Sequence, residues 1–114
     1  MVEVSRERFE ELVDAALDTI PAELAAMVHN LVVLVEEEPP PGEPDDLLGL
    51  YDGSTLGLDA AGHLPDQVFL YRRPLLDYCV TEEELVREIR VTVVHEIAHH
   101  FGIDDARLHE LGWA

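Results

Sequence analysis

The chain has a single cysteine and no lysine, and each scarcity excludes certain kinds of site or partner. Cys79 is the only cysteine among 114 residues, which excludes an internal disulfide and a metal site built from several cysteines. We expect Cys79 to be a small residue of the core. Long apolar runs are also missing, because a stretch such as residues 31–35 is far shorter than the roughly 20 residues that cross a membrane.

Positive charge is scarce as well. There is no lysine, and seven arginines stand against 25 acidic residues, for a net charge of −18. A field of this sign repels phosphate groups, so we expect neither nucleic acid nor an anionic membrane as a partner. Two interpretations of the acidic surface remain: it keeps the protein soluble, or it attracts a basic peptide or a basic partner protein.

The length and the first residues of the chain set further expectations. A chain of 114 residues suits one small domain, and no repeat or linker divides it, so we expect a single domain over residues 1–114. The first residues are charged and form no apolar signal segment, which favours a cytoplasmic protein. The sequence does not indicate an oligomeric state.

Helical periodicity marks four segments. Apolar residues at helical spacing predict an amphipathic helix over residues 5–18, with Ser5 as its N-cap. A second, short helix is expected over 21–28, because proline is tolerated at the first position of a helix. A third begins after Thr81, whose Thr-Glu-Glu-Glu run forms a capping box, and its apolar surface predicts a largely buried helix. A last short helix is expected over 104–111.

Strand signals lie between these helices. Residues 31–35 form a continuous apolar run, rich in β-branched side chains, that is typical of a buried strand. Shorter strands are expected at 47–51 and 67–72. Residues 36–46 are acidic and contain three successive prolines, which cannot join a ladder of backbone hydrogen bonds, so we expect an exposed loop there.

The helix that begins after Thr81 carries the sequence His-Glu-Ile-Ala-His at residues 95–99. Residues four apart lie one above the other on a helix, so His95 and His99 can direct two imidazole nitrogens at one metal ion. Glu96 lies about 100° round the helix, where its carboxylate can reach a metal-bound water without being a ligand. This H-E-x-x-H pattern is typical of a zinc site with a general base.

A catalytic zinc ion takes a third protein ligand and leaves its fourth position to water. Gly102 follows His99 by three residues and suits a left-handed turn that ends the helix and reverses the chain. Asp105 stands three residues beyond this glycine; Asp104 competes with it for the ligand role, and spacing favours Asp105. The extended pattern H-E-x-x-H-x-x-G-x-x-D matches the metzincin branch of zinc peptidases, with Asp where most members have His.

With these residues identified, the chain resembles a family of minimal zincin-like proteins of bacteria that are described as zinc metallopeptidases. The resemblance covers residues 47–112 through three runs: Leu-Leu-Gly-Leu-Tyr, Pro-Asp-Gln-Val-Phe-Leu-Tyr-Arg-Arg-Pro and Thr-Val-Val-His-Glu-Ile-Ala-His-His-Phe-Gly-Ile-Asp-Asp. The chain differs from larger metzincins in one respect. Both of its methionines, Met1 and Met27, precede the motif, so no methionine-containing turn can lie beneath the metal.

The resemblance implies an α+β protein with a minimal zincin-like fold, in which a small mixed sheet packs against an N-terminal helix and the active-site helix. It also implies one Zn²⁺ ion held by His95, His99 and Asp105, with Glu96 as the catalytic base. In zincins an edge strand borders the cleft and pairs with extended substrate, so we expect residues 67–72 to lie at the edge of the sheet.

These features favour a zinc-dependent metallopeptidase that acts on a peptide or protein substrate, with a basic peptide as one candidate. Zinc would lower the pKa of the attacking water. Glu96 would accept the proton of this water and pass it to the leaving amine. Candidates for stabilising the oxyanion are, by residue type, Tyr71, Arg72, Tyr78 and His100. Three alternatives remain: a non-catalytic zinc protein, an acidic interaction module, and a hydrolase of small molecules or nucleic acid.

Overall fold

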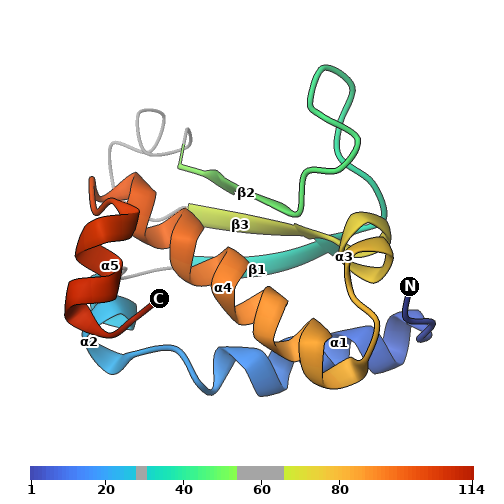
Figure 1. Cartoon of the computed structure of the whole chain (residues 1–114). Coiled ribbons are helices and arrows are strands. Elements are labelled where there is room, and N and C mark those ends of the chain that lie inside the picture. Colours follow the sequence, from blue (N-terminus) through green and yellow to red (C-terminus); the bar gives the residue numbers. More distant parts are fainter. Residues whose placement is uncertain (28–30, 54–65) are drawn as a thin grey trace.

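The computed structural model describes residues 1–27, 31–53 and 66–114 (Figure 1). It has the α+β fold that the sequence predicts: a small mixed sheet packs against the long helix α4, Glu82–His100, and the N-terminal helix α1, Arg6–Leu17, packs on α4. Helices α2 (Ala22–Ala25), α3 (Arg72–Tyr78) and α5 (Asp105–Leu111) are shorter. No helix in these described ranges is long and apolar enough to span a bilayer.

The described residues form a sheet of three strands in the order β1-β3-β2. β1, Leu31–Glu36, runs parallel to β3, Asp66–Tyr71, and β2, Gly49–Asp52, runs antiparallel to β3. The prediction that residues 67–72 form an edge strand is therefore wrong. β3 is the central strand, and β2 is the edge strand that contacts α4. Strand order depends on pairing between distant segments, which the pattern within one strand does not report.

β1 is less buried than its apolar sequence predicts. A continuous run of apolar residues is typical of a strand covered on both faces, yet the residues of β1 are half buried and its last residue, Glu36, is exposed. β1 lies at the opposite edge of the sheet from β2. Its alternate residues Leu31, Val33 and Val35 pack against the core, so only one face of this strand is well covered.

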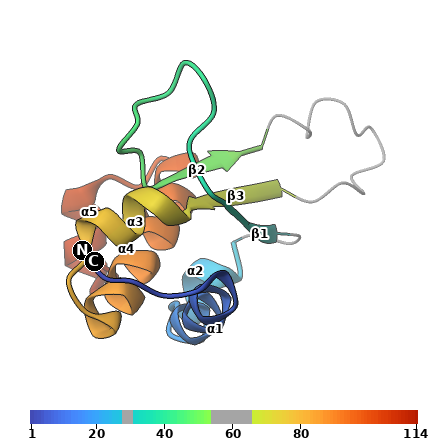
Figure 2. The same ribbon diagram turned by 90° about the vertical axis from the view of Figure 1, so that its right-hand side faces the viewer.

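The core lies between the sheet and the helices, and Figure 2 shows α1 and α4 on the same side of the sheet. Ser5 caps α1 as predicted, because its hydroxyl oxygen accepts a hydrogen bond from the backbone N–H of Arg8 at 3.1 Å. The apolar stripe of α1 and the long helix α4 supply most of the buried side chains, together with β3: Phe9, Leu12, Val13, Ala16, Val68, Leu70, Leu85, Ile89, Val93 and Ile97.

Two helices differ from the sequence prediction. The second helix was expected over 21–28, but α2 is only one turn long, and residue 28 lies outside the described residues. Helix α3 was not predicted at all. It begins directly after β3 with Arg72, and Pro74 is its third residue, a position in the first turn that a proline tolerates because no intrahelical bond needs its N–H.

Candidate metal centre

Helix α4 holds two of the three candidate metal ligands, His95 and His99, and its start is capped. The hydroxyl oxygen of Thr81 accepts a hydrogen bond from the backbone N–H of Glu84 at 3.1 Å, as a capping box requires. The carboxylate of Glu84 accepts in return from the N–H of Val80 at 3.1 Å, one residue earlier than the pattern predicts. Seven residues of α4 are buried, so the helix can present its exposed side chains from a rigid base.

The end of α4 turns the chain back toward the histidines. Gly102 has a φ of +78°, in the left-handed region that glycine adopts without steric cost. The N–H of Ile103 donates to the carbonyl of Ala98 at 2.8 Å, and the N–H of Gly102 donates to that of His99 at 3.0 Å. These two bonds form a Schellman motif, which satisfies the last carbonyls of the helix and reverses the chain into α5.

The two neighbouring aspartates after this turn differ in what their side chains contact. Asp104 is the N-cap of α5, and its carboxylate accepts a hydrogen bond from the N–H of Arg107 at 2.9 Å. Asp105 instead faces the end of α4: its Oδ1 lies 3.1 Å from Nε2 of His99 and 3.9 Å from Nδ1 of His95. The spacing argument also favours Asp105 over Asp104.

His95, His99 and Asp105 together form a group suited to a metal ion, and their donor atoms all lie within 4.8 Å of one another. Neighbouring donors of a tetrahedral zinc site, with bonds of about 2.0–2.1 Å, lie roughly 3.3 Å apart. Two imidazole nitrogens and a carboxylate oxygen are also donors that zinc accepts. Small side-chain rotations would therefore complete the site, and the residues fit the ion.

The charge state of the group also suits a metal. The hydrogen bond with His99, helped by the nearby charge of His95, lowers the pKa of the Asp105 carboxyl below its usual value. Asp105 is therefore ionised at neutral pH, as a metal ligand must be. The group opens to solvent, since half of the His99 side chain and two thirds of that of Asp105 are accessible.

Glu96 lies outside this group and is held by the neighbouring strand. Its Oε1 accepts a hydrogen bond of 3.0 Å from the backbone N–H of Tyr51 in β2. Because β2 is an edge strand and residues along a strand alternate, this N–H points away from β3 and toward α4. The candidate base is thus oriented by the edge of the sheet, a contact that sequence analysis missed.

A groove leads away from Glu96 along α4. It has a volume of about 350 Å³ and lies between the segment before β2 and the exposed side of the helix. Its lining residues come from these two elements: Pro44, Asp46, Leu47, Leu48, Gly49, Glu88, Val91, Thr92, His95 and Glu96. The groove therefore has room for an extended chain next to the candidate base.

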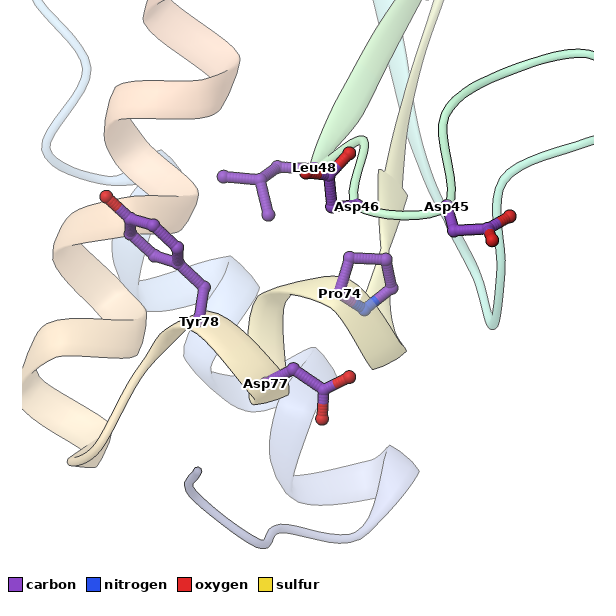
Figure 3. A pocket seen from close by; sticks show the side chains of 6 residues that line it. All are labelled: Asp45, Asp46, Leu48, Pro74, Asp77 and Tyr78. Carbon is purple, nitrogen blue, oxygen red and sulfur yellow. The ribbon is translucent and has the colours of Figure 1, made fainter.

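A second hollow of about 480 Å³ adjoins this groove, and the two share Asp46 and Leu48 (Figure 3). Leu48, Pro74 and Tyr78 surround it, and carboxylates stand at its rim. Figure 3 shows the carboxylate of Asp77 directed outward from α3. The hollow is therefore lined by both apolar and acidic side chains.

The four candidates for oxyanion stabilisation are engaged elsewhere or lie apart from the groove. Tyr71 is 2% exposed. The guanidinium of Arg72 bonds to Glu37 at 2.7 Å and to the carbonyl of Val4 at 2.6 Å. The others are Tyr78, at the second hollow, and His100, whose ring stacks on that of Tyr51. None of the four is among the residues that line the groove at Glu96.

Comparisons with known proteins agree with this geometry. Residues 28–113 match the family model described as zincin-like metallopeptidase. The structure of a conserved hypothetical protein from Thermo thermophilus is similar, with a TM-score of 0.61 and 25% sequence identity, over 86% of this chain and 94% of that one. No curated protein matches the chain significantly. The family match spans most of the chain, and the chain therefore belongs to the zincin-like metallopeptidase family.

Proposed function

We propose that this protein is a zinc-dependent metallopeptidase of the H-E-x-x-H-x-x-G-x-x-D type. In this proposal His95, His99 and Asp105 hold one Zn²⁺ ion, and Glu96 is the general base. The observation that carries it is the convergence of two imidazoles and one carboxylate within 4.8 Å, beside a glutamate held by the edge of the sheet. A zinc ion bound there would lower the pKa of a water toward about 7 and polarise a peptide carbonyl.

Glu96 performs the proton transfers in this mechanism. One of its carboxylate oxygens accepts the N–H of Tyr51, which restricts rotation of the side chain. The carboxylate takes a proton from the attacking water and then delivers it to the leaving amine, so one residue serves both steps. The exposed side of His99 and Asp105 leaves room for the substrate to approach.

A structural zinc site is the less favoured alternative. Such sites are closed by four protein ligands, whereas the described residues supply three donors at the end of α4, and this group is open to solvent. A structural site also has no use for a carboxylate placed beside the ligands. Glu96 follows the ligand candidate His95 directly, and its carboxylate accepts a hydrogen bond from the N–H of Tyr51 in β2.

The charge of the protein favours a basic peptide as substrate. The net charge is −18, and the apolar hollow next to the groove carries Asp45, Asp46 and Asp77 among its lining residues. A peptide lying in the groove could place the aliphatic part of an arginine or lysine against Leu48 and Tyr78, with its charge near these carboxylates. The edge strand beside α4 is β2 and not residues 67–72, and the N–H of Tyr51 at this edge is bonded to Glu96, so the groove along α4 is the proposed place for the peptide.

Zinc stoichiometry tests the metal site. The unmodified protein and the variants Glu96→Ala and Asp105→Ala are loaded with zinc, dialysed and submitted to elemental analysis. We expect one zinc ion per chain in the unmodified protein and in Glu96→Ala, and a clear loss in Asp105→Ala. Absence of zinc from all three proteins would contradict the proposal.

Cleavage of a peptide library then tests catalysis and substrate class. We expect the zinc-loaded protein to cleave peptides that contain arginine or lysine near the cut bond, and Glu96→Ala to be inactive although it keeps its zinc. Cleavage without such a preference would support peptidase activity but contradict the proposed preference for a basic substrate. Full zinc occupancy with no cleavage would favour the non-catalytic alternative.

A further inference from the structure

Tyr51 connects the central strand of the sheet to the end of α4. Its backbone N–H donates to Glu96 at 3.0 Å. Its ring stacks on His100, with ring centroids 4.1 Å apart and an interplanar angle of 15°. Both contacts reach the last turns of α4, where the candidate ligands His95 and His99 lie.

The hydroxyl of Tyr51 is anchored on a buried carboxylate. It donates to Oδ2 of Asp66, at the start of β3, over 2.5 Å, and Asp66 is only 8% exposed. The second oxygen, Oδ1, is buried and has no hydrogen-bond partner within the described part of the chain. The Tyr51 hydroxyl is therefore the one hydrogen-bond partner that the described residues give the Asp66 side chain. Burial, followed by this hydrogen bond and the charge of Asp66, raises the pKa of Tyr51, so its hydroxyl remains a donor at neutral pH.

The fit of β2 against α4 leaves little room for the strand to shift. A Cβ atom on Gly49 would lie 2.5 Å from Cγ2 of Thr92, and one on Gly53 would lie 3.0 Å from Cε1 of His100. Tyr51 lies between these two points of close approach. If β2 shifted, the N–H of Tyr51 would move away from Glu96. The hydrogen bond between the Tyr51 hydroxyl and Asp66 opposes such a shift.

We propose that Tyr51 is a positioning residue for Glu96, and that the bond between its hydroxyl and Asp66 fixes the strand whose N–H orients the base. The catalytic part of this inference rests on the proposed function, in which Glu96 is the general base. Tyr51 itself does not touch the reacting atoms. Its effect is geometric, and displacement of a catalytic group by about 1 Å can slow a reaction roughly 100-fold.

Amide hydrogen exchange in the metal-free protein tests the positioning contact without any assay of activity. Glu96→Ala removes the acceptor, and Tyr51→Phe removes the hydroxyl anchor but keeps the ring. We expect each change to raise the exchange rate of the residue 51 amide about tenfold, which corresponds to about 1.4 kcal/mol, the size of one net hydrogen bond. The amide of Ile89, in the buried middle of α4, serves as the internal reference.

Two further variants separate the anchor from general damage. Asp66→Asn keeps an oxygen acceptor for the Tyr51 hydroxyl, so we expect exchange at residue 51 to stay within about threefold of the unmodified protein. Glu10→Gln removes an exposed ion-pair partner of Arg6 on α1, outside the site, and should leave exchange at residue 51 unchanged. Unchanged exchange at residue 51 in Tyr51→Phe, or an equal rise at Ile89, would overturn the inference.

The catalytic consequence is measured on a peptide that the unmodified protein cleaves. We expect Tyr51→Phe to keep one zinc per chain and a similar KM while kcat falls about tenfold. Asp66→Asn, which keeps an acceptor for the Tyr51 hydroxyl, should retain most of the kcat of the unmodified protein. A rise of KM alone, or loss of zinc, would contradict a positioning role. If the zinc-loaded protein cleaves no peptide, the proposed function fails, but the exchange experiment still decides whether Tyr51 positions Glu96.

Discussion

At the scale of single residues, two identical neighbours show how local structure assigns roles. Asp104 and Asp105 carry the same side chain, but Asp104 has the extended backbone of an N-cap and Asp105 is the first residue of α5. The cap directs one carboxylate onto the N–H of Arg107 and leaves the other facing His99. A carboxylate that caps a helix is already engaged, which is why Asp105 is the better candidate for a metal ligand.

Substitution of these two aspartates should separate stability from metal affinity. Asp104→Ala removes the cap and should lower the free energy of unfolding of the metal-free protein by about 1 kcal/mol. Asp105→Asn should change that stability little but lower the affinity for zinc by about 100-fold or more. Loss of a residue that only hydrogen-bonds to a metal ligand already lowers metal affinity about 10- to 100-fold. Urea denaturation and zinc titration measure the two effects. Greater loss of zinc affinity in Asp104→Ala would reverse the assignment.

Cys79 provides a second test at this scale. The residue is 1% exposed, and burial, with smaller contributions from Glu88 and Glu84, raises the pKa of its thiol to about 11. We expect no reaction of the folded protein with a thiol reagent at pH 8 and full reaction after denaturation. The unfolded thiol, with an ordinary pKa of 9.0, loses its proton first, so this residue also makes stability fall as pH rises from 9 toward 11. Rapid labelling of the folded protein would contradict the buried position.

At the scale of secondary structure, the contact between β2 and α4 decides how the site is built. Gly49 permits this contact, since a Cβ there would lie 2.5 Å from Cγ2 of Thr92 and 2.9 Å from the carbonyl oxygen of Phe69. Real Cβ atoms do not approach so closely, and the strand would have to move. The same strand supplies the N–H that holds Glu96, so packing and site geometry are coupled.

Gly49→Ala should therefore destabilise the protein by about 1–3 kcal/mol, the usual cost of overpacking. Thr92→Ser removes the methyl group that the new Cβ would meet, so the double variant should recover part of the loss. Gly53→Ala is the comparison variant, because its new Cβ would meet only side chains, those of His100 at 3.0 Å and Tyr51 at 3.2 Å, whereas the Cβ at Gly49 also meets a backbone carbonyl at 2.9 Å. Thermal or urea unfolding of the four proteins measures the series. Equal losses in Gly49→Ala and Gly53→Ala would argue against the close contact.

At the scale of the whole molecule, zinc is expected to couple to folding. Three residues from two helices converge on the proposed ion, and they are adjacent only in the folded chain. A ligand present at 100 times its Kd adds about 2.7 kcal/mol, which for a domain of this size raises Tm by roughly 10 °C. Calorimetry with and without zinc measures the shift, and Asp105→Asn, which lacks a ligand, should show little of it.

The pH dependence of this shift has a definite sign. Both histidines must be neutral to bind zinc, so protons compete with the metal and zinc affinity falls as the pH falls. Asp105 does not limit binding near neutral pH, because its pKa lies below the usual value of 3.8. We therefore expect the gain in Tm from zinc to shrink as the pH is lowered from about 8 to about 5. A gain that does not depend on pH would argue against histidine ligands.

Much of the protein could be read from local patterns in the sequence. Helices α1 and α4, with their caps Ser5 and Thr81, follow from periodicity and capping chemistry, which act within a few residues. The reversal at Gly102 follows from its conformational freedom. The ligand candidates, although on two helices, lie within 11 residues along the chain, so the motif alone brings them near one another.

The tertiary structure decided whatever depends on distant segments. The place of β3 at the centre of the sheet, the exposure of β1 at its edge and the contact of Tyr51 with Glu96 join parts of the chain that are far apart in sequence. Periodicity shows which face of a strand is apolar, but it carries no information about which neighbour covers that face. The sequence by itself therefore determined the motif and the helix that carries it, and only the packing of β2 against that helix decided how Glu96 is held.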